Sequence, residues 1–73
     1  MHSKDPKVLL GKRIRQLREE KNWSQEELAE RAALHRNYVG GIERGERNAA
    51  IVNIVKLAHA LSVKPSVLLD NMS

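Results

Sequence analysis

The chain has 73 residues, of which 13 are lysine or arginine and nine are aspartate or glutamate, so its formal net charge is +4. A chain of this length buries only about 60 to 65% of its unfolded surface, which predicts one domain over residues 1 to 73. Because cysteine is absent, a disulfide framework and a thiolate metal site are excluded. No apolar run approaches the roughly 20 residues that span a bilayer, and the polar N-terminus does not resemble a signal peptide, so we expect a cytoplasmic protein with no membrane partner.

The first predicted helix follows a short polar arm, residues 1 to 6, which we expect to be flexible. Leu10, Ile14 and Leu17 recur at spacings of four and three, which indicates a helix from about residue 7 or 8 to residue 21 with one buried face. The basic residues between them therefore face solvent or a ligand.

Residues 24 to 44 predict two short helices joined by a turn, which is the layout of a DNA-binding helix-turn-helix. Ser24, with Glu27 three positions later, forms a capping box that begins the first helix of this motif. His35 takes the N-cap position of the second helix. That helix is expected to end near residue 44, because Gly45 can adopt the left-handed conformation that terminates a helix.

An apolar segment, AAIVNIVKLAHAL, predicts a fourth helix, in which five residues are available for burial: Ile51, Ile54, Val55, Ala58 and Leu61. Pro65 is well placed as the first residue of a short fifth helix that ends near residue 71. Three consecutive apolar residues follow this proline closely, Val67, Leu68 and Leu69, and they cannot all face one core. We therefore predict a homodimer whose interface includes Val52, Val67, Leu68 and Leu69.

These elements predict an all-α fold, a compact five-helix bundle with a central helix-turn-helix. The segment SQEELAERAALHRNYVGGIERGER resembles the lambda repressor-like (XRE) family of helix-turn-helix regulators, and the match extends over about residues 10 to 63. The residues that carry the resemblance are Gln25, Leu28, Ala29, Ala33, Leu34, Val39, Ile42, Glu43, Arg44 and Gly45. Within the family, LHRNYVGGIERGERN is most similar to the controller proteins of restriction-modification systems.

The resemblance implies a transcription regulator that binds a palindromic operator in double-stranded DNA as a homodimer and needs no cofactor. A controller would regulate its own gene and that of an adjacent endonuclease. Two alternatives stay open: an antitoxin or phage-type repressor on the same fold, and a protein-binding adaptor whose basic residues serve only solubility. No nucleophile is paired with a base, and no histidine spacing suits a metal, so we expect neither an enzyme nor a metal site.

The resemblance also assigns the residues that contact DNA. Arg36 and Asn37, at the start of the second helix of the motif, are expected to read base edges, because arginine pairs with guanine O6 and N7 and asparagine with adenine N6 and N7. Arg47 is expected to reach a base as well. Contacts with the DNA backbone are expected from Gln25, Tyr38, Arg44 and Asn48. Packing of the tyrosine ring into the core is an equal alternative.

Two further pairs match known positions of the family. Arg18 and Glu43 match an internal salt bridge beneath the second helix of the motif, so both are assigned to structure. Glu26 and Glu30, one turn apart, match acidic positions through which some phage activators touch RNA polymerase. The alternative is a solvated acidic face partnered by Arg31.

Two features depart from the family pattern. Ala33 stands where the turn usually has glycine, and alanine in a left-handed conformation costs on the order of 1 kcal/mol, so we expect a slightly reshaped turn. Gly40 and Gly41 replace side chains that read bases in other members, and each costs roughly 1 kcal/mol relative to alanine in a helix. Close approach of the backbone to DNA or tight helix packing would explain them, and fewer direct base contacts are expected.

Overall fold

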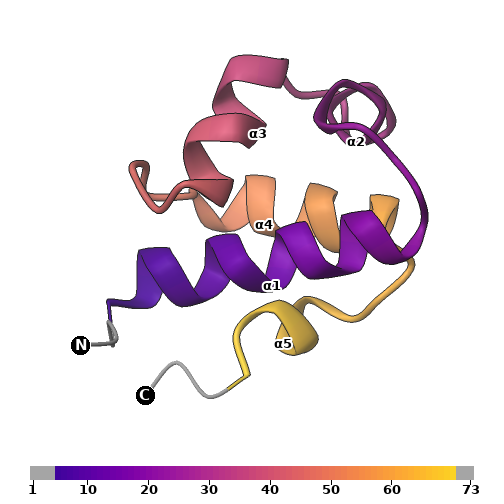
Figure 1. The fold of residues 1–73 in the computed structure, drawn as a ribbon. Helices are drawn as coiled ribbons and strands as arrows, with labels where there is room; N and C mark the ends of the chain where they lie inside the picture. The colour runs from indigo at the N-terminus through magenta and orange to yellow at the C-terminus, as the bar shows by residue number, and fades with distance from the viewer. Residues whose placement is uncertain (1–4, 71–73) are drawn as a thin grey trace.

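A computed structural model of the chain describes residues 5 to 70, which contain five α-helices and no strand (Figure 1). The helices are α1 Pro6–Glu20, α2 Gln25–Ala32, α3 Arg36–Glu43, α4 Ile51–Ala60 and α5 Pro65–Leu68. In Figure 1, α1 runs across the middle, α2 and α3 lie above it, and α5 lies below it. Helix α1 packs against α3 and α5, while α4 packs against α2 and α5. The predicted all-α fold is confirmed.

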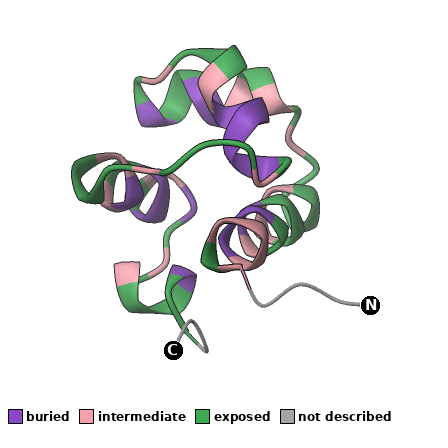
Figure 2. Ribbon diagram, turned by 90° about the vertical axis from the view of Figure 1, so that its left-hand side faces the viewer, coloured by how far each residue is buried: buried purple, intermediate pink, exposed green. Residues whose placement is uncertain are grey.

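One cluster of buried apolar side chains joins the helices, and Figure 2 shows buried residues on the sides that face one another. The cluster consists of Leu10, Ile14, Leu28, Ala29, Ala32, Val39, Ile42, Ile54, Leu57, Ala58, Leu61 and Leu68. The buried face predicted for α1 is present. The face of α4 differs, because Leu57 is fully buried whereas Ile51 is 62% exposed. Ile51 lies in the first turn of α4, beyond the part of the helix that the core covers.

Four helices end in the same backbone motif, in which a residue with positive φ follows the last turn. The next residue then donates its N–H to a carbonyl oxygen five positions earlier, as in a Schellman motif. The left-handed residues are Asn22, Ala33, Gly45 and Ser62, with φ angles of 60°, 57°, 75° and 61°. Only one of the four is glycine, so three of these ends carry the steric cost of a Cβ atom.

The turn between α2 and α3 is built around Ala33. Its φ and ψ angles of 57° and 45° are those that glycine usually supplies. The N–H of Leu34 donates to the carbonyl oxygen of Ala29 at 2.8 Å, and the N–H of Ala33 donates to that of Glu30 at 3.2 Å. The expected reshaping of the turn is therefore wrong, because the alanine adopts the left-handed conformation itself.

The two ends of the described chain differ from the prediction. Asp5 is the N-cap of α1, and its carboxylate accepts a hydrogen bond from the N–H of Lys7 at 2.9 Å. This backbone hydrogen bond, with the Lys7 ammonium, lowers the pKa of Asp5. Pro6 is the first helical residue, so residues 5 and 6 belong to the helix and not to an arm. The rest of the predicted arm, residues 1 to 4, lies outside the described residues.

Helix α5 ends at Leu68 rather than near residue 71, which also lies outside the described residues. Leu68 is fully buried in the core of its own chain. Its predicted place in a dimer interface is therefore wrong, because a side chain already enclosed within one protomer has no surface to offer a second. No helix in residues 5 to 70 has the length and apolar character needed to cross a membrane.

Candidate nucleic-acid interface

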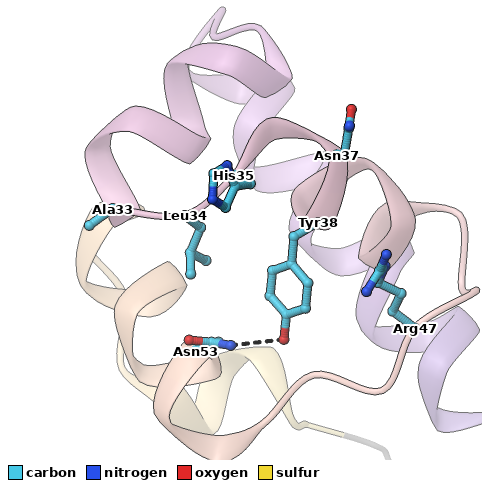
Figure 3. Close-up of a pocket in the computed structure, with 7 residues that line it drawn as sticks. All are labelled: Ala33, Leu34, His35, Asn37, Tyr38, Arg47 and Asn53. Atoms are coloured by element: carbon cyan, nitrogen blue, oxygen red, sulfur yellow. Dashed lines mark hydrogen bonds between the residues drawn. The ribbon is translucent and has the colours of Figure 1, made fainter.

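The two ends of α3 differ in exposure. Arg36 and Asn37 in its first turn are exposed, whereas residues 39 to 43 are buried. Neither exposed side chain forms a hydrogen bond or ion pair with the described residues, and Asn37 points away from the domain in Figure 3. The first turn of α3 therefore offers two polar side chains that can bind a partner. His35 occupies the N-cap position, although its side chain makes no capping hydrogen bond.

The buried end of α3 is held by the ion pair predicted between Arg18 and Glu43. The Nε atom of Arg18 donates to Oε2 of Glu43 at 2.7 Å, and Nη2 donates to Oε1 at 2.9 Å. The side chains are 11% and 2% exposed. The third guanidinium nitrogen, Nη1, donates to the carbonyl oxygen of Trp23 at 2.7 Å. The hydrogen bond with Glu43 raises the pKa of Arg18, so the guanidinium stays charged and fixes α3 to α1.

Gln25, the first residue of α2, joins the same network. Its Nε2 atom donates to Oε1 of Glu43 at 3.0 Å. Its own Oε1 atom lies over Gly40, 3.2 Å from where a Cβ atom would stand. The amide carries a second N–H that can donate to a phosphate. The sequence suggested the phosphate contact, but it did not suggest the bond to the buried pair.

Tyr38 is half-buried and packs between α3 and α4. Its hydroxyl oxygen accepts a hydrogen bond from Nδ2 of Asn53 at 2.9 Å (Figure 3). The guanidinium carbon of Arg47 lies 5.7 Å from the centre of the ring. Because the hydroxyl oxygen is the acceptor in this bond, the O–H group can still donate to another partner. Asn53 was not predicted, and its only signal in the sequence is a single amide inside a mostly apolar segment.

A surface pocket lies between the turn and α4, and it brings three of the predicted DNA-contacting residues together (Figure 3). It is lined by Ala33, Leu34, His35, Asn37, Tyr38, Arg47 and Asn53. Arg44 lies outside this pocket and pairs with Glu46 at 3.1 Å in solvent. Asn48 is exposed and lines a separate apolar groove beside Pro6 and Leu69.

The acidic side of α2 is arranged differently from the prediction. Ser24 caps the helix by accepting the N–H of Glu27 at 3.0 Å. The carboxylate of Glu27 pairs with Arg31 at 2.6 Å, so the expected partner of Glu26 and Glu30 is taken. Within residues 5 to 70, those two exposed glutamates form no ion pair. Among the same residues, no three side chains gather as a metal site would require.

One glycine that the sequence did not mark proves structural. A Cβ atom on Gly11 would stand 2.7 Å from the carbonyl oxygen of Glu43, so the backbones of α1 and α3 touch at this point. Gly40 and Gly41 are different, because the atoms that lie over them belong to side chains: Gln25 and Arg44 over the first, and Arg47 over the second.

Comparison with known proteins agrees with this geometry. A helix-turn-helix family model matches residues 14 to 68. Control protein C.BamHI of Bacillus amyloliquefaciens is 49% identical over 65 residues, which cover 88% of this chain and 80% of that protein. Control protein C.SmaI of Serratia marcescens is 43% identical over 65 residues, covering 89% and 77%. The crystal structure of the restriction-modification controller protein C.AhdI from Aeromonas hydrophila has a TM-score of 0.83 at 53% identity, covering 85% of this chain and 94% of that one.

The chain therefore belongs to the helix-turn-helix (XRE-type) family, which comprises DNA-binding transcription regulators and not enzymes, and it is similar to restriction-modification controller proteins.

Proposed function

We propose that this regulator binds a palindromic operator as a homodimer and acts as a restriction-modification controller of its own gene and of an adjacent endonuclease gene. The observation that carries the proposal is the exposed first turn of α3, held on a buried ion pair, in a chain similar to controller proteins over most of its length. Such a protein would repress by covering a promoter, and it would work in the cytoplasm, where its operator is. An antitoxin or phage-type repressor on the same fold is the second candidate.

Three residues are proposed to read bases: Arg36, Asn37 and Arg47. All three are exposed, and the last two line one pocket beside α3. Arginine and asparagine can each form two hydrogen bonds with a base edge in the major groove, which discriminates by about 1 to 3 kcal/mol per base. The exposed start of α3 supports this assignment.

Four residues are proposed to contact phosphates: Gln25, Tyr38, Arg44 and Asn48. Gln25 lies at the N-terminus of α2, where free N–H groups and the helix dipole favour an anion. The charge of Arg44 is exposed on the loop after α3. These contacts would position the protein on the duplex without specifying its sequence.

The dimer interface is proposed to use the exposed apolar residues of α4 and the α5 region. Val52, Val67 and Leu69 are 61%, 38% and 39% exposed, and Ile51 is 62% exposed. For the two copies of α3 to read half-sites one helical turn of DNA apart, a twofold axis through this surface would have to hold them about 34 Å apart. The operator would then be two half-sites with that spacing.

Activation through RNA polymerase is proposed for Glu26 and Glu30, because both are exposed while their neighbour Glu27 is paired with Arg31. Glu26→Lys should leave operator affinity unchanged and abolish activation in a transcription assay. Glu20→Lys makes the same charge change on α1 and should leave both unchanged. Equal activation by wild type and by Glu26→Lys would overturn this assignment.

Selection of bound sequences from random duplex DNA tests the proposed function. At about 150 mM salt, unspecific attraction to phosphates is much reduced. Recovery of an imperfect palindrome with half-sites one turn apart would support an operator-binding dimer. Recovery of nothing above background would favour the adaptor, in which the apolar residues of α4 and α5 bind a different protein.

A further inference from the structure

The loop after α3 turns back along the helix that precedes it. Gly45 adopts the left-handed conformation, with φ of 75°, and the N–H of Glu46 donates to the carbonyl oxygen of Gly41 at 2.9 Å. This hydrogen bond closes the last turn and fixes the direction in which the chain leaves it. The next residue, Arg47, is consequently placed beside α3 rather than away from it.

The side chain of Arg47 occupies the space that a side chain at position 41 would fill. A Cβ atom on Gly41 would stand 3.0 Å from Cδ of Arg47 and 3.1 Å from both its Cγ and Nε atoms. Favourable contacts between carbon atoms are about 3.5 to 4.0 Å. Any other residue at position 41 would therefore displace the stem of Arg47 by a few tenths of an ångström, and the guanidinium at its end would move with it.

The far end of Arg47 lies over another fixed group. Its guanidinium carbon is 5.7 Å from the centre of the Tyr38 ring, and the Tyr38 hydroxyl is bonded to Asn53 (Figure 3). Arg47 and Asn37 line the same pocket. The stem of Arg47 thus lies against Gly41 and its guanidinium near the Tyr38 ring, on the side of α3 where Asn37 is exposed.

We propose that Gly41 is a positioning residue for operator specificity: because it has no Cβ atom, Arg47 of the following loop takes the place of an α3 side chain among the base-reading groups. The proposal rests on the proposed operator binding. It explains how a recognition helix with two adjacent glycines presents a second arginine besides Arg36, and arginine is the side chain best suited to guanine O6 and N7. The side chain of Arg47 thus covers the surface of α3 at Gly41.

The test compares wild type, Gly41→Ala, Arg47→Ala and the double variant on the operator that wild type selects. Arg47→Ala should weaken binding on the order of tenfold and relax selection at specific base positions. Gly41→Ala should weaken binding about threefold or more and relax the same positions, since it misplaces the same bidentate contact. The double variant should bind no more weakly than Arg47→Ala, because the two changes remove one contact.

Gly40→Ala is the matched control. It makes the same change one residue earlier, where the nearest atoms belong to Arg44 and Gln25, at 3.1 and 3.2 Å, and not to Arg47. When Gly40→Ala is combined with Arg47→Ala, the fold-loss in affinity should equal the product of the two single fold-losses. Alanine favours a helix over glycine, so both variants should melt no lower than wild type, and any lost affinity cannot then come from unfolding.

The outcomes separate this proposal from the one on which it rests. If wild type selects no operator, the proposed function itself fails. If wild type selects an operator but Gly41→Ala keeps its full preference, the positioning role is overturned and operator binding stands. The positioning role would also be overturned if the double variant lost affinity by the product of the two single losses, as is expected for the control pair.

Discussion

The guanidinium of Arg18 and the carboxylate of Glu43 meet in the interior through hydrogen bonds of 2.7 and 2.9 Å, and Glu43 is only 2% exposed. Because Glu43 is the last residue of α3 and Arg18 belongs to α1, the pair fixes the C-terminal end of α3, opposite its exposed first turn. The orientation of the exposed end therefore depends on a bond at the buried one.

Removal of Arg18 should lower stability strongly, because its partner Glu43 is buried. Arg18→Met leaves the Glu43 carboxylate buried with only the Gln25 amide beside it, and should lower the free energy of unfolding by about 3 to 5 kcal/mol. The pKa of Arg18 is higher in the folded protein than in the unfolded chain. The ion pair therefore contributes its full stability at any pH below the unfolded pKa, and this contribution is lost only as the pH rises through the folded pKa. Urea unfolding near neutral pH measures the effect.

Arg15→Met is the control on the same helix. Arg15 pairs with Glu19 at 3.1 Å, but the two side chains are 63% and 55% exposed, and exposed pairs of this kind contribute only about 0.3 to 0.5 kcal/mol. Equal losses for the two variants would show that the buried pair has no special role.

Ala33→Gly should stabilise the protein. Glycine removes the steric cost of the left-handed conformation but adds freedom to the unfolded chain, so the net gain should be a few tenths to about 1 kcal/mol. Ala32→Gly, one residue earlier and helical, should instead lower stability by at least about 1 kcal/mol, because glycine is unfavourable in a helix and the buried methyl group of Ala32 is lost. Thermal unfolding of both variants measures these changes in stability. A loss of stability in Ala33→Gly would mean that the turn is not strained.

Val52 and Leu68 should respond to substitution in opposite ways. Val52→Asp and Val52→Lys alter a side chain that is 61% exposed, so each should leave the protomer folded while abolishing the dimer. Leu68→Ala removes a fully buried side chain and should cost about 2 to 5 kcal/mol of unfolding free energy. Sedimentation at matched concentrations distinguishes them. Dimers of wild-type affinity in both Val52 variants would place the interface elsewhere.

The proposed phosphate contacts should separate by their salt dependence. Arg44→Ala removes a positive charge, so it should weaken binding to all sequences and lower the slope of log affinity against log salt by about one unit. Gln25→Ala removes a neutral donor and should weaken all sequences alike with an unchanged slope. Anisotropy titrations at several salt concentrations give both numbers. An unchanged slope for Arg44→Ala would remove it from the DNA contact surface.

The number of helices and the helix-turn-helix could be predicted because their signals are local. Ser24 and Gly45 mark helix ends by their own chemistry, and the spacing of Leu10 and Ile14 marks a buried face. The buried face of α4 and the end of α5 were predicted less well. Whether Ile51 or Leu57 is buried depends on how α4 lies against its neighbours, which periodicity alone does not determine.

The sequence predicts residues for the candidate site, but it does not predict the bonds that connect them. Arg36 and Asn37 were identified from their place in the motif, and the structure leaves both exposed. The bonds from Gln25 to Glu43 and from Asn53 to Tyr38 join residues 18 and 15 positions apart, so no local pattern announces them. The contact of Gly11 with the end of α3 belongs to the same class.

Methylation interference on the selected operator tests the central claim most directly, that the first turn of α3 reads bases. Methylation of guanine N7 blocks the bidentate contact proposed for Arg36. Wild type should be sensitive to the guanine in each half-site that Arg36 contacts, with the two about one helical turn apart, and Arg36→Ala should lose sensitivity at those two guanines alone. Identical interference patterns for wild type and Arg36→Ala would contradict the assignment of base recognition to Arg36 and to the start of α3.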